Sequence, residues 1–571
     1  MADPGGTSED LPTTTSAEPS APAITAAFHV PIFRRAWGSS LASSLGLLIQ
    51  SVGSAWAMTQ LSGSPEKVAL VQTALMIPIM IFAMPAGAIA DMYDRRIVAL
   101  IAVSVSLAGA SGLALSSLTG LLTPELLLSL CFVIGAGMSL MGPAWQSSVS
   151  EQVPPEILPS AIALSSINYN LARSFGPAVG GAIVAAAGPS AAFVTNAVLY
   201  IPAFIVLLMW KRPRQPMRLP PERMGRAIIS GVRYIVHSPP TRVVLVRSLA
   251  TAVAGGAVSA LMPLVSRDLL GGDAQTFGIL LGAYGVGAVF GAFSLSRLRG
   301  RFRNETLLRL SGGGAGLAII LVASSHLLAL TLAALFVAGA FWTVTFSLFN
   351  IEIQVSSPRW VAGRSLAAFQ ATAAGGAGIG AAVWGVVART YGIHAGLIYS
   401  GLAIIACAAL GVWLKMPAAA DAASSAESEL PVEPQVQLGL TPRSGPIVIE
   451  MEYRVDPAQA RAFYQTMQQI QSIRQRNGAY NWAIARDVTD PALWTERFNC
   501  PTWLDYLRLR SRPTQADRLI ERAAWNMHEG PEPVRIRRML ERPFGSVRWQ
   551  EEVPDSGGRD PLPLSAFPGG T

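Results

Sequence analysis

Long apolar runs, separated by short polar intervals, make up most of the chain between residues 36 and 414. The hydrocarbon core of a bilayer is about 30 Å thick and needs about 20 apolar residues per helix. The pattern therefore predicts an all-α polytopic membrane region with twelve transmembrane helices. The predicted spans are Ala36–Met58, Val68–Ala90, Ile97–Leu118, Leu126–Val149, Leu158–Ala187, Ala191–Trp210, Val243–Val265, Phe277–Leu298, Leu307–Ser325, Ala329–Ile353, Ser365–Ala388 and Ile393–Leu414.

A basic interval, residues 211–241, divides the predicted spans into two sets of six. Within it, Met224–His237 carries apolar residues at helical spacing with arginines between them. This pattern predicts a short helix lying on the cytoplasmic surface of the membrane. A solvated basic linker is the alternative. The predicted membrane halves are residues 33–210 and 242–416.

The two halves are similar in sequence. When the chain is shifted by 202 residues, the segment that starts at Glu151 aligns with the one that starts at Ile353, and Gly176 meets Gly378. Duplication within a helical membrane protein is typical of transporters, whose substrate site lies near the midplane between the repeats.

After residue 416 the composition changes. Residues 417–445 are rich in Ala, Ser, Glu and Pro and predict a flexible linker. Residues 446–548 predict a soluble domain with the order βαββαβ, a small α+β ferredoxin-like fold, and 549–571 a disordered tail. The predicted strands are residues 446–455, Tyr480–Asp487, Leu493–Asn499 and Val534–Leu540, and the predicted helices are Pro457–Arg476 and Thr502–His528.

Composition and charge agree with a membrane protein. Hydrophobic residues make up 51 % of the chain, charged residues only 14 %, and mean hydropathy is +0.41, whereas soluble domains carry about 25 % charged residues. Much of the net charge of +8 lies in intervals on one side of the predicted spans, so it indicates orientation and not a nucleic-acid partner. Both termini are expected in the cytoplasm of a multi-pass protein of the bacterial inner (cytoplasmic) membrane. Residues 1–32 have no secretory leader and predict a disordered cytoplasmic tail.

The segment GAIADMYDRR ends the second predicted span. It resembles the loop signature of the major facilitator superfamily, which implies a rocking transporter of two six-helix halves. The resemblance makes Gly87, Asp91, Arg95 and Arg96 candidates for a conformational switch, with the carboxylate at a helix N-terminus and the arginines pairing with carboxylates or lipid phosphates. An ordinary loop that follows the positive-inside rule is the alternative.

The fifth predicted span contains GPAVGG. It resembles the glycine-proline signature of exporters in this superfamily, although the usual preceding glycine is Ala172 here. Pro177 removes a backbone hydrogen bond and bends the helix, while Gly176, Gly180 and Gly181 allow close packing against the other half. The resemblance implies outward transport of a drug or metabolite. Packing glycines without that function are the alternative.

Arg173 is the only charge deep in a predicted span of the first half. A buried charge of this kind usually faces a cavity or a partner, so Arg173 is a candidate for binding an anionic group of the substrate. The alternative is a structural arginine satisfied by carbonyls or by Glu352. Further candidates for the substrate cavity are polar and aromatic residues of the same and other spans: Asn168, Tyr169, Asn170, Gln50, Trp56, Gln146, Trp342, Asn350 and Gln370.

The energy source is less clear from the residues. The first and fourth predicted spans lack the acidic residue, and the fourth lacks the arginine, that many proton antiporters of this superfamily carry. Glu151 and Glu352 remain as candidates for proton coupling. No glycine-rich phosphate loop of the GxxxxGK type is present, so an ATP-driven pump is disfavoured. No cofactor or metal is expected.

The soluble tail contains YRVDPAQARAF, RNGAYNW and DYLRLRSRPTQADR. With the twelve predicted spans, these resemble the enterobactin-exporter-like transmembrane secretion effectors, and the tail is similar to an antibiotic-biosynthesis-monooxygenase domain. The resemblance implies a secondary exporter of a small amphipathic molecule such as a siderophore or drug, with protons as the coupling ion and dimerisation possible through the tail. A membrane-tethered monooxygenase-like enzyme and a ligand sensor are the alternatives.

Overall fold

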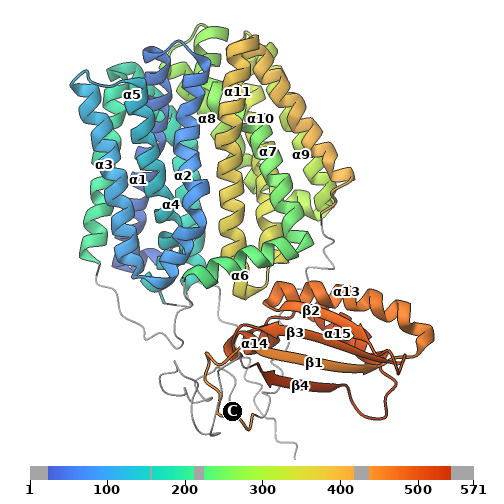
Figure 1. The fold of residues 1–571 in the computed structure, drawn as a ribbon. Coiled ribbons are helices and arrows are strands. Elements are labelled where there is room, and N and C mark those ends of the chain that lie inside the picture. The colour runs from blue at the N-terminus through green and yellow to red at the C-terminus, as the bar shows by residue number, and fades with distance from the viewer. Residues whose placement is uncertain (1–23, 155–156, 211–223, 417–435, 542–571) are drawn as a thin grey trace, which may run out of the picture.

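The computed structural model describes residues 24–154, 157–210, 224–416 and 436–541. Long helices run side by side in a bundle, α6 (Met224–His237) lies across one end of it, and a small α+β domain lies beyond α6 (Figure 1). That end is called the α6 end below, and the other the opposite end. The predicted tail 549–571 lies outside the described residues, as do residues 1–23 of the other predicted tail and residues 211–223 and 417–435 of the predicted linkers. Residues 24–32 were predicted to be disordered, but they form the short helix η1 (Ile24–His29) and the start of the first long helix.

In the described part of the chain, ten helices are long and apolar enough to cross a membrane. Several begin with proline in the first turn, where its missing N–H costs nothing, so they start before the apolar run does. The ten are α1 (Pro31–Leu61), α2 (Pro65–Met92), α3 (Arg95–Leu118), α4 (Pro124–Gln152), α5 (Leu158–Met209), α7 (Pro239–Leu264), α8 (Ala274–Arg301), α9 (Asn304–Ser324), α10 (Leu328–Ser356) and α11 (Arg359–Ala409).

Two of these helices are interrupted by a glycine. In α5, Gly188 has φ 76°, and in α11, Gly392 has φ 87°, a conformation that side chains disfavour. The segments of α5 before and after Gly188 pack on α1 in opposite directions, because Gly180 lies against Ile49 and Val52, whereas the later Asn196 lies against Gly46. Each long helix therefore folds back where the sequence predicts a boundary between two spans. The count of twelve crossings stays a prediction.

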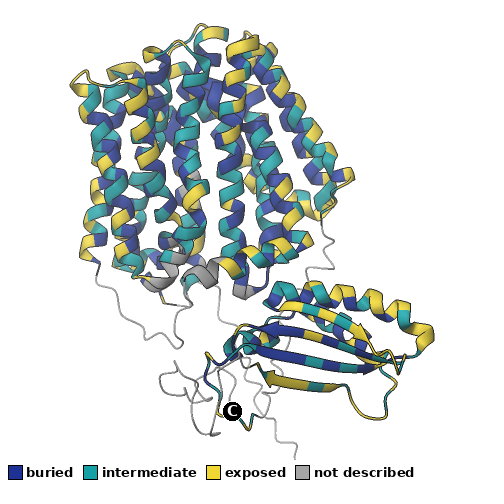
Figure 2. Cartoon of the chain, in the orientation of Figure 1, coloured by how far each residue is buried: buried dark blue, intermediate teal, exposed yellow. Residues whose placement is uncertain are grey.

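The bundle presents many large apolar residues on its outer surface. Buried positions gather between helices, and exposed positions lie on the outer faces and loops (Figure 2). Many of the exposed side chains are large and apolar, among them Leu115, Phe293 and Leu317, each more than 60 % exposed. Such a surface is stable against lipid but not against water.

Two seams join the halves. In one, α5 packs on α8; in the other, α2 packs on α11. The α2–α11 seam includes a hydrogen bond from Thr73 Oγ1 to the carbonyl oxygen of Gly378 (2.8 Å). These pairings are equivalent under the sequence repeat, because the fifth helix of each half meets the second helix of the other.

The C-terminal domain has one antiparallel sheet in the order β2-β3-β1-β4, which is the ferredoxin-like order that the sequence predicts. Its core centres on Tyr453, Phe463 and Phe498. The single helix predicted for Thr502–His528 is wrong: it is two helices, because Pro513 interrupts it and Thr514 caps the second. The elements are β1 (Ile447–Arg454), α13 (Ala460–Asn477), β2 (Tyr480–Arg486), β3 (Leu493–Cys500), α14 (Trp503–Ser511), α15 (Gln515–Asn526) and β4 (Arg535–Leu540).

Candidate functional site

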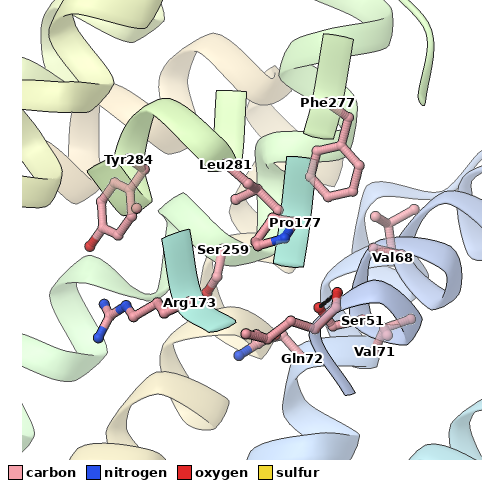
Figure 3. Close-up of a pocket in the computed structure, with 13 residues that line it drawn as sticks. Ser51, Val68, Val71, Gln72, Arg173, Pro177, Ser259, Phe277, Leu281 and Tyr284 are labelled. Carbon is pink, nitrogen blue, oxygen red and sulfur yellow. Dashed lines mark hydrogen bonds between the residues drawn. The ribbon is translucent and has the colours of Figure 1, made fainter. Parts of the chain in front are cut away.

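A cavity of about 240 Å³ lies between the two halves. Helices α1, α2 and α5 of the first half and α7 and α8 of the second contribute to its wall, as Figure 3 shows for the labelled side chains. This is the position between repeats where transporters hold substrate. The lining residues are Leu48, Ser51, Ala55, Val68, Val71, Gln72, Arg173, Pro177, Ser259, Phe277, Leu281, Tyr284 and Gly285.

The cavity has a polar and an apolar side. Arg173 extends toward the hydroxyl of Tyr284 (Figure 3). The apolar side is formed by aliphatic and aromatic residues from α2 and α8, including Val71 and Phe277. The described lining residues carry one positive charge and no carboxylate. Such a surface suits a small amphipathic molecule with a neutral or anionic polar group.

The glycines of GPAVGG pack on two different helices, α1 and α8. A β-carbon added to Gly181 would lie 2.6 Å from the Cα of Gly278 in α8, whereas one added to Gly176 or Gly180 would meet Leu48 or Ile49 of α1, in the same half. Gly181 therefore makes the close approach to the other half that the sequence predicts, and Gly176 and Gly180 pack within their own half.

Near Gly181, the α5–α8 seam also forms one wall of the cavity. Ser174 Oγ donates to the carbonyl oxygen of Gly285 (3.4 Å), and a β-carbon added to Gly285 would lie 2.9 Å from the carbonyl oxygen of Arg173. The backbone that carries Arg173 is thus fixed directly against α8.

Contacts between the halves close the cavity toward the opposite end. Trp56 stacks on Phe277 with ring centroids 6.4 Å apart. Beyond them, Arg267 Nη1 donates to the carbonyl oxygen of Thr59 (3.3 Å), and Arg389 Nη1 pairs with Glu66 Oε2 (2.5 Å). Trp56 was predicted to line the cavity. It lies instead behind the lining residue Phe277, among the contacts that close the cavity toward the opposite end.

At the α6 end the predicted switch is not closely packed. A β-carbon at Gly87 would meet nothing within 4 Å, so the expectation that this glycine permits a close approach does not hold in this conformation. Arg96 donates to the carbonyl oxygens of Leu207 (2.8 Å) and Leu208 (2.6 Å), which end α5 in the same half. Its partners among the described residues are therefore carbonyl groups of its own half, where carboxylates were expected. Arg95 is half-buried.

Two predicted cavity residues of the first half bind inside that half. The amide of Asn168 donates to the carbonyl oxygen of Trp37 (2.8 Å), and Gln50 is fully buried and accepts a hydrogen bond from Asn196. Neither lines the cavity described above. Asparagine and glutamine side chains in membrane helices hydrogen-bond across to neighbouring helices, and both of these do so.

The predicted residues of the second half also lie away from the described lining. Trp342 packs on Gly255, Asn350 accepts a hydrogen bond from Gln354, and Gln370 is exposed. Glu352 is buried, with 7 % of its surface exposed. The side chains of the other predicted site residues lie outside the described part of the chain: Tyr169, Asn170, Gln146, Asp91 and Glu151.

Several functional positions escape sequence analysis. Three polar residues of the cavity lining stand in apolar runs without a motif that marks them: Gln72, Ser259 and Tyr284. The closely spaced glycines of GAYGVGAVFG could have identified α8 as a helix that packs on the other half. Arg247 was also missed: it is 3 % exposed and pairs with Glu305 (2.7 Å) and the carbonyl oxygen of Leu414 (3.0 Å).

The C-terminal domain holds a buried ion cluster between its sheet and helices. Arg474 binds Glu496 (3.1 Å) and Glu521 (2.5 Å), and Glu496 also accepts from Tyr453 (3.2 Å) and Trp482 (3.0 Å). Burial alone would lower the pKa of Arg474, but the two carboxylates raise it above its usual value. These groups satisfy one another. No group of three candidate ligands for a metal occurs among the described residues.

Comparison with known proteins agrees with the geometry. A family model described as "Transmembrane secretion effector" matches residues 23–544. The chain is 25 % identical to the MFS-type transporter YfiS of Bacillus subtilis, over 61 % of this chain and 84 % of that protein. It is 22 % identical to the multidrug efflux pump Tap of Mycobacterium tuberculosis (69 % and 96 %) and 28 % identical to the enterobactin exporter EntS of Escherichia coli (53 % and 72 %).

Solved structures share the fold at low identity. The nucleoside transporter NupG superposes with a TM-score of 0.56 at 12 % identity, over 67 % of this chain and all of that one. A bacterial homologue of the lysosomal transporter Spinster, solved inward-facing and occupied, gives 0.53 at 12 % identity, over 69 % of this chain and 98 % of that one.

Proposed function

Because the chain belongs to the transmembrane secretion effector family of major facilitator transporters, we propose that it exports a small amphipathic molecule by alternating access. The α6 end is the cytoplasmic side in this proposal, as the basic intervals of the sequence indicate. Substrate enters the cavity from that side and leaves at the opposite end.

One observation carries the proposal. The amphipathic cavity lies between two halves that are tied together toward the opposite end by the Trp56–Phe277 stack and the Arg389–Glu66 pair. Toward the α6 end, a β-carbon added to Gly87 of α2 would meet nothing within 4 Å, although Met84 of the same helix packs against the second half. A transporter that loads from the cytoplasm has this distribution of contacts.

The export step follows from the same contacts. Rocking about the α5–α8 seam separates Arg389 from Glu66 and opens the cavity outward, while the ends of α2 and α11 approach at the α6 end. In that state Gly87, with Asp91 and Arg95, would form the switch that the loop signature implies. Bistable contacts of this kind set the balance between the two conformations.

The substrate class follows from the cavity and from the relatives, which include transporters of enterobactin, staphyloferrin A and drugs. Arg173, held at the cavity beside Tyr284, binds the anionic or polar group, and the apolar side receives the rest of the molecule. A charge-assisted hydrogen bond from an arginine is about twice as strong as a neutral one. Substrates with an acidic or phenolic group are therefore preferred.

Proton coupling is part of the proposal. Since the described cavity lining has no carboxylate, the proton carrier lies outside it, and Glu352 near the α6 end of α10 is the best-placed described candidate. Protonation of a buried carboxylate removes the cost of burying its charge, which allows the helix ends to close around it.

The experiment is uptake into inside-out membrane vesicles, in which an exporter accumulates its substrate. A panel of siderophores and drugs is compared with and without a proton gradient. Arg173→Gln should reduce uptake at least tenfold, and the matched control Arg34→Gln, an exposed arginine near the start of α1, should leave it unchanged. Absence of uptake of any compound by the wild type, or equal uptake by Arg173→Gln, contradicts the proposal.

A further inference from the structure

Helix α6 contacts both membrane halves and the C-terminal domain. Tyr234, which is 3 % exposed, donates to the carbonyl oxygen of Ser356 at the end of α10 (3.2 Å). Gly231 packs on Arg364 of α11, where an added β-carbon would lie 3.0 Å from Cδ. The helix also touches α2 of the first half and α7 of the second. It therefore spans the junction between the halves at their α6 end (Figure 1).

The C-terminal domain meets this same helix through the end of α13. The guanidinium carbon of Arg476 lies 5.8 Å from the ring centroid of Tyr234, within the range of a cation–π contact. A β-carbon added to Gly478, which caps α13 with φ 119°, would lie 3.4 Å from Arg233 Nη1. The domain and α6 are thus in contact at two points: Arg476 lies against the ring of Tyr234, and Gly478 lies beside Arg233.

Arg476 is held in place from its own domain. Its Nη2 lies 2.5 Å and 2.6 Å from the two carboxylate oxygens of Asp517 in α15, and its side chain is only 17 % exposed. A guanidinium fixed in this way loses little further entropy when it meets an aromatic ring. Asp517 is itself fixed, because it forms the capping box of α15 with Thr514.

We propose that Arg476, Gly478 and Asp517 form a docking surface for α6, and that docking of the C-terminal domain stabilises the arrangement of the two halves described here. The domain then acts as a clamp on the junction helix: a signal that releases it would shift the transporter toward the other conformation. This inference concerns how the conformations are balanced and holds whatever the substrate is.

The physical basis is differential binding. A contact shifts a two-state equilibrium only if it is stronger in one state. Helix α6 touches α2 in one half and α7, α10 and α11 in the other, so rocking of the halves moves at least one of its supports. Where this movement shifts Tyr234 relative to Arg476, docking favours the arrangement in which the two meet.

The first test measures docking in the full-length protein in lipid nanodiscs by hydrogen–deuterium exchange. Arg476→Glu should speed exchange of residues 229–237 by about fivefold to thirtyfold, the range expected for loss of a desolvated cation–π contact. The matched control is Arg461→Glu, an exposed arginine at the other end of α13. Unchanged exchange in Arg476→Glu, or an equal change in Arg461→Glu, overturns the inference.

Arg476→Glu also places a like charge beside Asp517, so a second pair of variants keeps the C-terminal domain intact. Tyr234→Ala removes the ring from α6 and should speed exchange of residues 474–478. Tyr234→Phe keeps the ring, loses the hydrogen bonds of the hydroxyl, including the one to Ser356, and should leave that segment protected. Equal protection in Tyr234→Ala and the wild type contradicts docking through this ring.

The second test measures the conformational balance. Spin labels at Tyr93 and Phe302, exposed positions after α2 and α8 in the two halves, report the separation of the halves at the α6 end. Arg476→Glu and Tyr234→Ala should each lower the ratio of the wide to the narrow population at least threefold, whereas Arg461→Glu should not. If docking is lost by exchange but the distance distribution is unchanged, the domain binds α6 without acting as a clamp, and that part of the inference is wrong.

Discussion

A single methyl group at Gly181 tests whether the α5–α8 seam is as close as the structure describes. The added β-carbon of Gly181→Ala would lie 2.6 Å from the Cα of Gly278 and 2.8 Å from the carbonyl oxygen of Ala274. Ordinary contact between these atoms requires about 3.5 Å or more. The helices must therefore separate by about 1 Å, or the halves must adopt another arrangement.

The cost can be bounded. Overpacking by one methyl group costs about 1–3 kcal/mol, whereas alanine in place of glycine within a helix gains about 0.5–1 kcal/mol. Gly181→Ala should thus destabilise the seam by a net amount of up to about 2.5 kcal/mol. Gly313→Ala in α9 is the matched control, because its β-carbon would meet nothing within 4 Å and only the helix gain remains.

The assay is thermal unfolding in nanodiscs together with the accessibility of a cysteine probe at the opposite end. Gly181→Ala should unfold at a lower temperature than Gly313→Ala and expose the probe more often, because the halves separate at their tightest contact. If the two variants unfold at the same temperature with equal probe accessibility, the backbone approach of α5 and α8 does not exist in the membrane, and the reasoning is refuted.

Three further predictions follow from other contacts. Gly87→Ala should raise stability by about 0.5–1 kcal/mol, because nothing lies within 4 Å and only the helix gain remains. It should nevertheless slow substrate uptake if the outward-open state brings a helix against this glycine. Equal uptake by mutant and wild type would remove Gly87 from the switch. Arg389→Glu removes the ion pair with Glu66 and should shift the balance toward the outward-open state by up to about fivefold, because an exposed pair contributes about 0–1 kcal/mol. Adding Glu66→Arg to the same chain should restore the original balance in a probe-accessibility assay. Arg474→Met should lower the free energy of unfolding of the C-terminal domain by about 3–5 kcal/mol, because Glu496 loses its buried counter-charge. A chemical denaturation curve unchanged from wild type would show that the ion cluster around Arg474 is not buried as described.

The architecture could be predicted because it depends on one-dimensional signals. Apolar run length gives the membrane helices, the Gly-Pro-Ser break at residues 188–190 gives the reversal at Gly188, and the βαββαβ succession of elements gives the ferredoxin-like sheet. The close approach at Gly181 follows from the same logic, since only glycine lets two backbones meet. These signals need no knowledge of which helix lies next to which.

The lining of the cavity depends on that knowledge and could be predicted only in part. Arg173 was identified because a charge in an apolar run is costly wherever it lies. Gln50 and Asn168 carry the same polar signal as Gln72, yet the first two bond to neighbouring helices and the third faces the cavity. The rotation of a helix about its axis determines whether a polar side chain faces a neighbouring helix or the cavity. Packing between helices sets that rotation. Tyr284 is missed for the same reason.

The two seams between the halves are equivalent in the repeat but differ in their packing. At the α5–α8 seam Gly181 meets Gly278 backbone to backbone, whereas at the α2–α11 seam Gly378 and Gly375 pack on the side chains of Met76 and Met80. A glycine contact has no side chains that could adjust to sliding, while methionine side chains are flexible and adopt new rotamers at little cost. The halves are therefore expected to pivot at α5–α8 and to slide at α2–α11. Helix α6 contacts α2 and α11 of the seam that is expected to slide, so the C-terminal domain is attached where it would have most influence over that motion.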